Sequence, residues 1–145
     1  MSGAAAAREI PIGIRLNNPC NIEISNTPWR GKVSPSSHPP YEEYDTPENG
    51  IRNGARNFLT SYRIHGNRTV LALIKRHAPA SDKNPTEGYA AFVAKALQVG
   101  VEDEIDLERI AVLEPFVTAV IRFENSEQPY DQDLIHICCI RALAA

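Results

Sequence analysis

The sequence lacks long apolar runs, a disulfide framework and any classical export signal. No segment of its 145 residues is long enough to span a bilayer, and no charged start is followed by an apolar stretch. The three cysteines, two of them adjacent at positions 138 and 139, do not form the pattern of a disulfide scaffold. We therefore expect reduced thiols and synthesis in the cytoplasm, with no membrane partner.

Several kinds of site are missing as well. The formal net charge is -3 and the basic residues are scattered, which argues against duplex DNA as the main partner. The four histidines lie far apart without zinc-site spacing, and no glycine-rich phosphate loop is present. We expect no metal, no cofactor and no nucleic acid. A thiol dyad of Cys20 with a histidine stays open, because Cys20 lies in a turn and is the cysteine most easily exposed.

What remains is the composition of an ordinary globular domain, with 43% hydrophobic and 23% charged residues. Residues 9–40 are rich in Pro, Asn and Ser, with short apolar alternations such as Ile10, Ile12 and Ile14, which predict irregular chain with one or two short strands. From Thr46 onward the pattern is helical. We predict one mainly α (α+β) domain over residues 1–145, with a small irregular or β N-terminal lobe and a flexible start at 1–9.

Capping signals divide the helical part. Thr46 and Pro47 predict a helix start, and Gly66 and Gly100 mark two helix ends. Asp106 is expected to cap a short helix, after which Pro115 begins another. The predicted helices cover about 47–65, 69–78, 86–99, 106–114, 115–124 and 134–145.

Glu124 is the most informative residue, because it continues the apolar stripe of its helix. Val117, Val120 and Ile121 precede it at helical spacing, which places its carboxyl on the apolar face. Partial burial and the nearby helix C-terminus both raise the pKa of a carboxyl, and a protonated glutamic acid can protonate a glycosidic oxygen. The alternative is a carboxyl that points into water or pairs with Arg122 or a more distant arginine.

A second group of acidic residues lies between positions 42 and 48, beside two tyrosines. Asp45 and Glu48 are candidates for a second carboxylate across a sugar-binding cleft. The alternative is a solvated loop followed by an acid that caps a helix.

The segment 13–22, Gly-Ile-Arg-Leu-Asn-Asn-Pro-Cys-Asn-Ile, resembles the G-I-R-x-N-N-P-G-N-I opening of a group of phage-encoded proteins. These proteins are often described only as virion or structural proteins and are similar to peptidoglycan hydrolases. The resemblance covers most of the chain. It continues at Trp29, Gly31, Tyr41, Tyr44, Gly50-Ile51-Arg52, Tyr62, Gly66, Ala78-Pro79, Asn84 and Tyr89.

Two positions depart from that pattern. Cys20 stands where the pattern has glycine, and Asn53-Gly54 replaces the alanine that usually follows the Gly-Ile-Arg unit. If the glycine serves a left-handed turn, Cys20 is strained there by about 1 kcal/mol or more.

A looser similarity concerns the order of motifs. Phe123-Glu124-Asn125-Ser126 resembles the Glu-Ser unit at a helix end in lytic transglycosylases and goose-type lysozymes. In those families a β region follows the glutamate, whereas here the β-like segment comes first. The resemblance implies a lysozyme-like fold read from a different starting point, as after circular permutation.

These resemblances imply a glycosidase that cuts between N-acetylmuramic acid and N-acetylglucosamine, by hydrolysis or transglycosylation. Glu124 is the expected acid, and either Asp45, Glu48 or the substrate's acetamido group stabilises the positive charge. For Asn17, Asn18 and Asn21 the alternative to substrate binding is a structural role, because asparagine is common in turns. The expected substrate-binding residues are Asn17, Asn18, Asn21, Trp29, Tyr44, Arg52 and Tyr89.

Two other functions stay open. One is a non-enzymatic virion or tail protein that holds glycan or another virion protein, and the other is an injected antibacterial effector with the same chemistry. In each case we expect a monomer, made in the bacterial host cytoplasm without a signal peptide, whose partner is the peptidoglycan of the cell wall.

Overall fold

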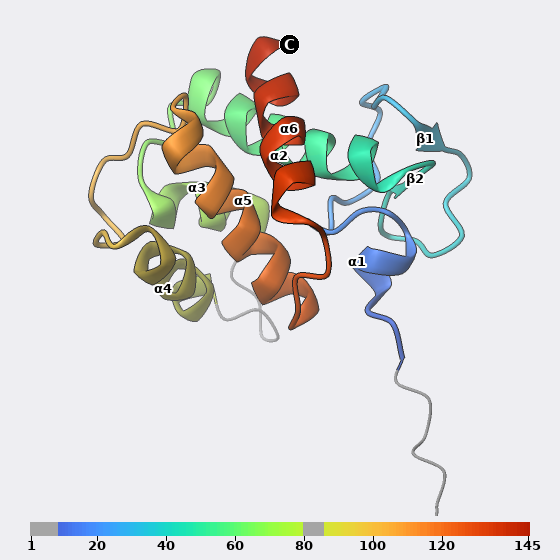
Figure 1. The fold of residues 1–145 in the computed structure, drawn as a ribbon, viewed down its shortest axis with the longest axis horizontal. Helices are drawn as coiled ribbons and strands as arrows, with labels where there is room; N and C mark the ends of the chain where they lie inside the picture. Colours follow the sequence, from blue (N-terminus) through green and yellow to red (C-terminus); the bar gives the residue numbers. More distant parts are fainter. Residues whose placement is uncertain (1–8, 80–85) are drawn as a thin grey trace, which may run out of the picture.

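The computed structural model describes residues 9–79 and 86–145, so most of the predicted flexible start lies outside the described residues. The described part is mainly helical with a small antiparallel sheet, which confirms the predicted fold class. A small lobe, residues 9–46, lies to one side of a larger helical body, residues 47–79 and 86–145 (Figure 1). The elements in chain order are α1 (Ile12–Arg15), β1 (Lys32–Val33), β2 (Glu43–Tyr44), α2 (Pro47–Arg63), α3 (Val70–His77), α4 (Thr86–Leu97), α5 (Ile110–Asn125) and α6 (Gln132–Ala144).

The helices α2, α3 and α4 lie where the sequence predicts them. Thr46 caps α2 by accepting a hydrogen bond from the backbone N–H of Asn49 at 3.1 Å, and Thr69 caps α3 in the same way from Ala72 at 3.1 Å. Each hydroxyl satisfies one of the N–H groups that a helix start leaves unpaired. The capping signal at Thr46 therefore predicted the start of α2 correctly.

The prediction of two helices around Pro115 is wrong, because α5 runs without interruption from Ile110. Pro115 has no N–H to donate, yet Leu113 and Phe116 beside it are fully buried and hold both flanks in the same core. Asp106 forms a turn ahead of the helix, where its carboxylate accepts from the backbone N–H of Glu108 at 3.1 Å.

The lobe contains two short strands, as expected, but they lie elsewhere. The alternating Ile12 and Ile14 belong to the single turn of α1, not to a strand. The sheet pairs Lys32 with Tyr44 and Val33 with Glu43, and a separate isolated bridge joins Glu23 to Tyr41. In this short segment the alternation of apolar residues was not sufficient to distinguish a strand from a helical turn.

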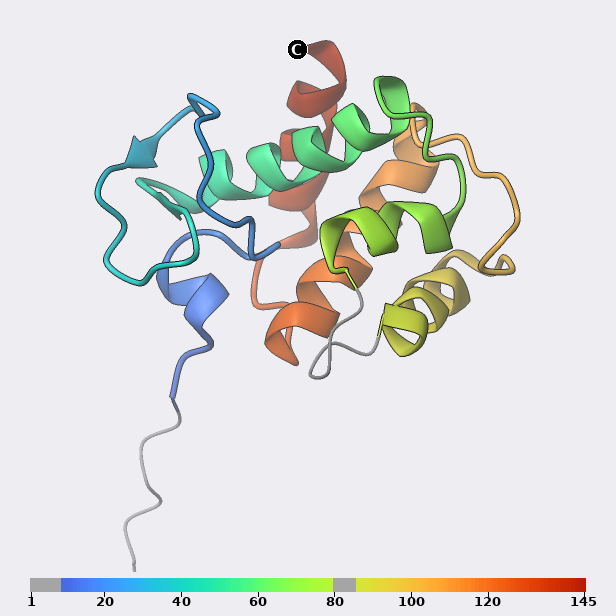
Figure 2. The same cartoon turned by 180° about the vertical axis from the view of Figure 1, so that it is seen from behind.

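The core lies within the helical body. Helix α2 packs on α6, and α5 packs on both α4 and α6, while α3 closes the opposite side against α4 (Figure 2). The small lobe joins this body through α1, which contacts α5, and β2, which contacts α2. Among the described residues, no helix has both the length and the hydropathy needed to cross a membrane.

The two departures from the resembled pattern lie against each other. A Cβ added at Gly54 would come within 2.5 Å of the Sγ atom of Cys20. Cys20 is fully buried and is not among the residues with positive φ, so the expected strain is absent. Within the segment 13–22 the positions with positive φ are Asn17 and Asn21, both at φ 54°. Glycine at position 54 thus leaves space for the side chain at position 20.

Candidate functional site

Glu124 lies at the end of α5 with three side chains gathered around its carboxylate. Asn21 Nδ2 donates to Oε1 at 2.9 Å, and the Tyr89 hydroxyl donates to Oε2 at 2.7 Å. The His77 Nε2 atom lies 3.3 Å from Oε2. The side chain of Glu124 is 17% exposed and that of His77 only 5%. The predicted partial burial of this carboxyl agrees with the structure, but the groups in contact with the carboxylate are polar rather than apolar.

The expected direction of its pKa is wrong. Burial raises the pKa of Glu124, but the hydrogen bond and positive charge of His77, together with the hydrogen bonds from Tyr89 and Asn21, outweigh burial and lower the pKa below its usual value. Donors around a carboxylate stabilise its ionised form, and no local sequence pattern indicated them. In the free protein Glu124 is therefore an ionised carboxylate at neutral pH.

Four separate segments position this cluster. His77 is the last residue of α3, where its ring packs against Phe58 with centroids 4.6 Å apart. Tyr89 is a buried residue of α4, and its ring stacks on Phe123 at 4.1 Å. These ring contacts fix the orientation of the two donors relative to the carboxylate.

Asn21 is held by the chain that follows α1. A Cβ at Gly13 would lie 2.6 Å from Asn21 Oδ1, so only glycine permits this close approach. Asn125, the neighbour of Glu124, donates from Nδ2 to the carbonyl of Pro19 at 2.8 Å. The G-I-R-x-N-N-P segment is thereby tied to the end of α5.

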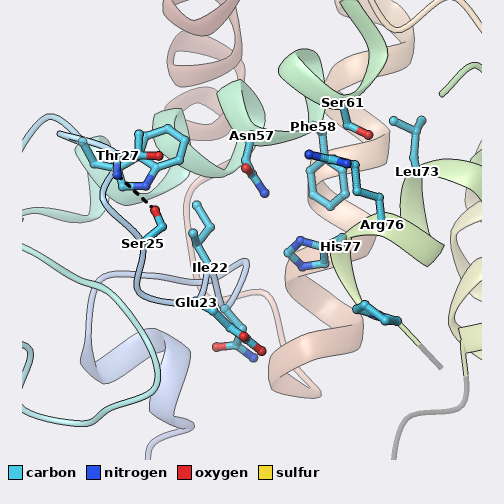
Figure 3. A pocket seen from close by; sticks show the side chains of 13 residues that line it. Ile22, Glu23, Ser25, Thr27, Asn57, Phe58, Ser61, Leu73, Arg76 and His77 are labelled. Carbon is cyan, nitrogen blue, oxygen red and sulfur yellow. Dashed lines mark hydrogen bonds between the residues drawn. The ribbon is translucent and has the colours of Figure 1, made fainter. Parts of the chain in front are cut away.

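Two adjoining pockets form a groove beside Glu124. The smaller, of about 290 Å³, contains Glu124 itself, and the larger, of about 510 Å³, extends from it towards Trp29. Figure 3 shows the larger pocket, with Ser25 and Thr27 on one side and His77 on the other. The two pockets share Asn21, Glu23, His77 and Pro79. Their combined size suits a ligand larger than one ring, since small-molecule sites span roughly 300–1,000 Å³.

The structure brings only some of the predicted residues to this groove. Asn21 and Trp29 line it, while Tyr89 contributes its hydroxyl to Glu124 rather than an exposed ring for stacking. Asp45 and Glu48 are not among its lining residues, and Asp45 accepts instead from Asn49 at 2.8 Å.

Other predicted ligand-binding residues have structural roles. Asn18 is fully buried and hydrogen-bonds the backbone of Ile22 and Glu42, and Asn17 Nδ2 donates to the carbonyl of Tyr44 at 3.1 Å. Tyr44 itself is 1% exposed and cannot stack on a sugar. Arg52 donates to Asn53 Oδ1 at 3.0 Å and does not line the groove.

Sequence reasoning missed Glu23 and His77. Glu23 is an exposed carboxylate that lines both pockets, and His77 is the imidazole that contacts Glu124. The sequence signal available for His77 was its position at a helix end just before the Ala78-Pro79 pair. Nothing in the local sequence marked Glu23, which reaches the groove because the lobe folds back towards α5.

The thiol alternative is not supported by the structure. Cys20 is buried, and burial, followed by the nearby charges of Glu124 and Cys139, raises the pKa of its thiol well above the usual value. A thiol nucleophile needs a lowered pKa and access to substrate. No group of three His, Cys, Asp or Glu side chains suited to a metal ion occurs within residues 9–79 and 86–145.

Comparison with known proteins gives one informative relative. No protein-family model matches the sequence. The chain is 34% identical over 127 residues to Protein P5 of Pseudoalteromonas phage PM2, an alignment that covers 85% of this chain and 76% of the relative. At this identity and coverage, the chain belongs to the family of the phage protein P5.

Proposed function

We propose that this protein cleaves the glycan strands of bacterial peptidoglycan, with Glu124 as the acid and base of the reaction. The observation that carries the proposal is a largely buried carboxylate, held by three side chains, that opens into a groove of sugar-binding size. Hydroxyl and amide side chains line that groove together with Trp29, as is suitable for sugar hydroxyls and pyranose faces. The relative is a protein of a bacteriophage, and peptidoglycan is a barrier that a phage meets at its bacterial host.

Glu124 must take up a proton before it can act as an acid, because its neighbours keep it ionised in the free protein. A strand that covers the carboxylate displaces the remaining water, and this loss of solvation raises the pKa of Glu124. Glu124 then protonates the glycosidic oxygen as its bond to the anomeric carbon breaks. Water, or the primary hydroxyl of the same sugar, attacks that carbon, and its proton returns to the carboxylate.

Glu23 replaces Asp45 and Glu48 as the candidate for the second carboxylate. It lines the pocket that contains Glu124, and both side chains face the same groove. A negative charge there stabilises the positive charge that develops on the sugar ring. The acetamido group of the substrate remains the alternative source of this stabilisation.

A second function, glycan binding without catalysis, is favoured by one observation. The donors around Glu124 lower its pKa, which suits a structural carboxylate that ties α3, α4 and the lobe together. In that case the protein holds peptidoglycan or another virion protein as part of the phage particle.

Digestion of purified sacculi distinguishes the two functions. The wild type should release soluble fragments, and Glu124→Gln should lower the rate by about 100-fold or more, as expected when a general acid is lost. Glutamine keeps the site filled, because the Tyr89 hydroxyl can turn to accept from its amide. Glu102→Gln is the matched control, since Glu102 is exposed and does not line the groove.

The outcomes are separable. Mass spectrometry of the fragments identifies reducing ends from hydrolysis or anhydro ends from transglycosylation. If the wild type and Glu124→Gln digest sacculi equally fast, the catalytic role of Glu124 is wrong. If neither digests them but both sediment with them, the binding function is correct.

A further inference from the structure

The larger pocket is lined by one charged residue to which the proposed reaction gives no role, Arg76. Figure 3 shows Arg76 and His77 on the α3 side, with Asn57 and Phe58 of α2 between them and the opposite loop. Apart from the imidazole of His77, its ionisable lining residues are Glu23, near Glu124, and Arg76, from α3. The groove thus has a negative charge where it meets the smaller pocket and a positive charge in its larger part.

Arg76 is available to a ligand. Its Nη2 group donates to His65 Nε2 at 2.9 Å, so this histidine nitrogen is an unprotonated acceptor. In the part of the chain that the structure describes, the Arg76 guanidinium has no carboxylate partner. A guanidinium has five N–H donors, and its planar geometry suits a carboxylate.

We propose that this pocket binds the carboxylate-bearing substituent of muramic acid through Arg76, so that the protein prefers peptidoglycan strands to neutral amino-sugar polymers. This inference rests on the proposed function and names its substrate determinant. The carboxylate belongs to the lactyl group where a sugar carries no peptide, and to the peptide stem where one is attached, because the stem is joined through an amide at the lactyl carboxyl. Glu23 repels that anion from the end of the groove near Glu124, so the substituent lies towards Arg76.

Binding can be measured directly because the sequence contains a single tryptophan, Trp29, and it lines this pocket. Tryptophan fluorescence is titrated on a Glu124→Gln background, which prevents turnover. Three soluble ligands are compared: chito-oligosaccharides without carboxylate, glycan strands stripped of peptide that keep the lactyl carboxylate, and strands with intact stems. The variants are Arg76→Gln and, as matched control, Lys75→Gln on the same helix but outside the groove.

Arg76→Gln should weaken binding of carboxylate-bearing strands by about tenfold and leave chito-oligosaccharide binding unchanged, because a charge-assisted hydrogen bond is lost. Lys75→Gln should bind all three ligands as its parent does. A loss only on stripped strands assigns the contact to the lactyl carboxylate, and a loss only on intact strands assigns it to a carboxylate of the stem. A loss on both ligands means that Arg76 binds either carboxylate.

Three results overturn the inference: equal weakening for all three ligands, equal weakening by Lys75→Gln, or no response of Trp29 to any strand. The proposed function is tested separately by digestion of sacculi. If the protein digests sacculi but does not prefer carboxylate-bearing ligands, only the proposed role of Arg76 is contradicted. If it binds such ligands selectively through Arg76 but does not digest sacculi, only the proposed catalytic function is contradicted.

Discussion

The small lobe and the helical body are held together by different kinds of contact. In the body, buried apolar residues from α2 to α6 form one continuous core. In the lobe, two of the most buried side chains are polar: Asn18 is 0% exposed and Glu42 is 1% exposed. Glu42 accepts from Lys32 Nζ at 3.1 Å and from the backbone of Ser25 at 3.2 Å. Hydrogen bonds between buried polar groups therefore stabilise the lobe, which has little regular structure, where apolar packing stabilises the helical body.

The lobe and the helical body each form one wall of the groove, so this difference in stabilisation affects the two walls separately. Asn21 and Glu23 come from the lobe, while His77 and Glu124 come from the helical body. The hydrogen bond from Asn21 to Glu124 links the two parts across the candidate site. Stability of the body and placement of the lobe should consequently respond to different substitutions.

The largest expected effect is in the body, at Phe116. Its ring is fully buried and packs edge-on against Phe58 with centroids 4.9 Å apart. Phe116→Ala should lower the free energy of unfolding by about 3 to 5 kcal/mol, because it leaves a cavity. Phe92→Ala, at a position that is 39% exposed, is the matched control and should cost about 1 kcal/mol. Similar losses for the two variants in denaturant unfolding would contradict the description of the core.

A smaller effect, confined to the lobe, is expected at Asn18. Its side chain donates to the carbonyls of Ile22 and Glu42, both at 2.9 Å, and accepts from the N–H of Ile22 at 3.0 Å. Asn18→Ala leaves these buried groups unpaired and should cost about 2 to 3 kcal/mol. Amide hydrogen exchange should rise in the lobe while the helices stay protected, and the same substitution at an exposed position, Asn26→Ala, should change neither. Uniform loss of protection would mean that the two parts unfold as one.

The contact between Cys20 and Gly54 joins the lobe to α2 and can be tested by a double-mutant cycle. Gly54→Ala places a Cβ 2.5 Å from Cys20 Sγ and should cost about 1 to 3 kcal/mol. The same change combined with Cys20→Gly should cost less than the sum of the single changes, because the added methyl then has space. Additive losses would show that the two positions are independent.

The sequence predicted what depends on neighbouring residues and missed what depends on distant ones. Thr46 identified a helix start because a cap acts within three residues. Glu124 stood out because its apolar stripe is local. The donors to its carboxylate could not be identified from the sequence, since Asn21, for example, lies 103 residues away in the chain. The predicted direction of the Glu124 pKa shift was wrong for the same reason. Burial follows from a local pattern, whereas the hydrogen-bond partners follow from the tertiary fold.

The smallest expected effect is the contribution of Glu124 to stability as pH changes. Its pKa is lower in the folded protein than the usual value of a glutamate, so the folded state binds this proton less tightly than the unfolded chain. The ionised carboxylate therefore stabilises the fold at neutral pH. This contribution disappears as pH falls below the usual glutamate value of about 4.3 and through the lower pKa of the folded state.

Glu124→Gln cannot titrate, so its free energy of unfolding should fall less steeply in this acidic range than that of the wild type. The difference in slope should not exceed about 1.4 kcal/mol per pH unit, the limit for a single proton. Denaturant unfolding at several pH values measures both curves, with Glu102→Gln as the exposed control. Parallel curves for the wild type and Glu124→Gln would mean that the contacts from His77, Tyr89 and Asn21 do not favour the ionised carboxylate. The lobe and the body would then meet at this residue without an electrostatic contribution to their contact.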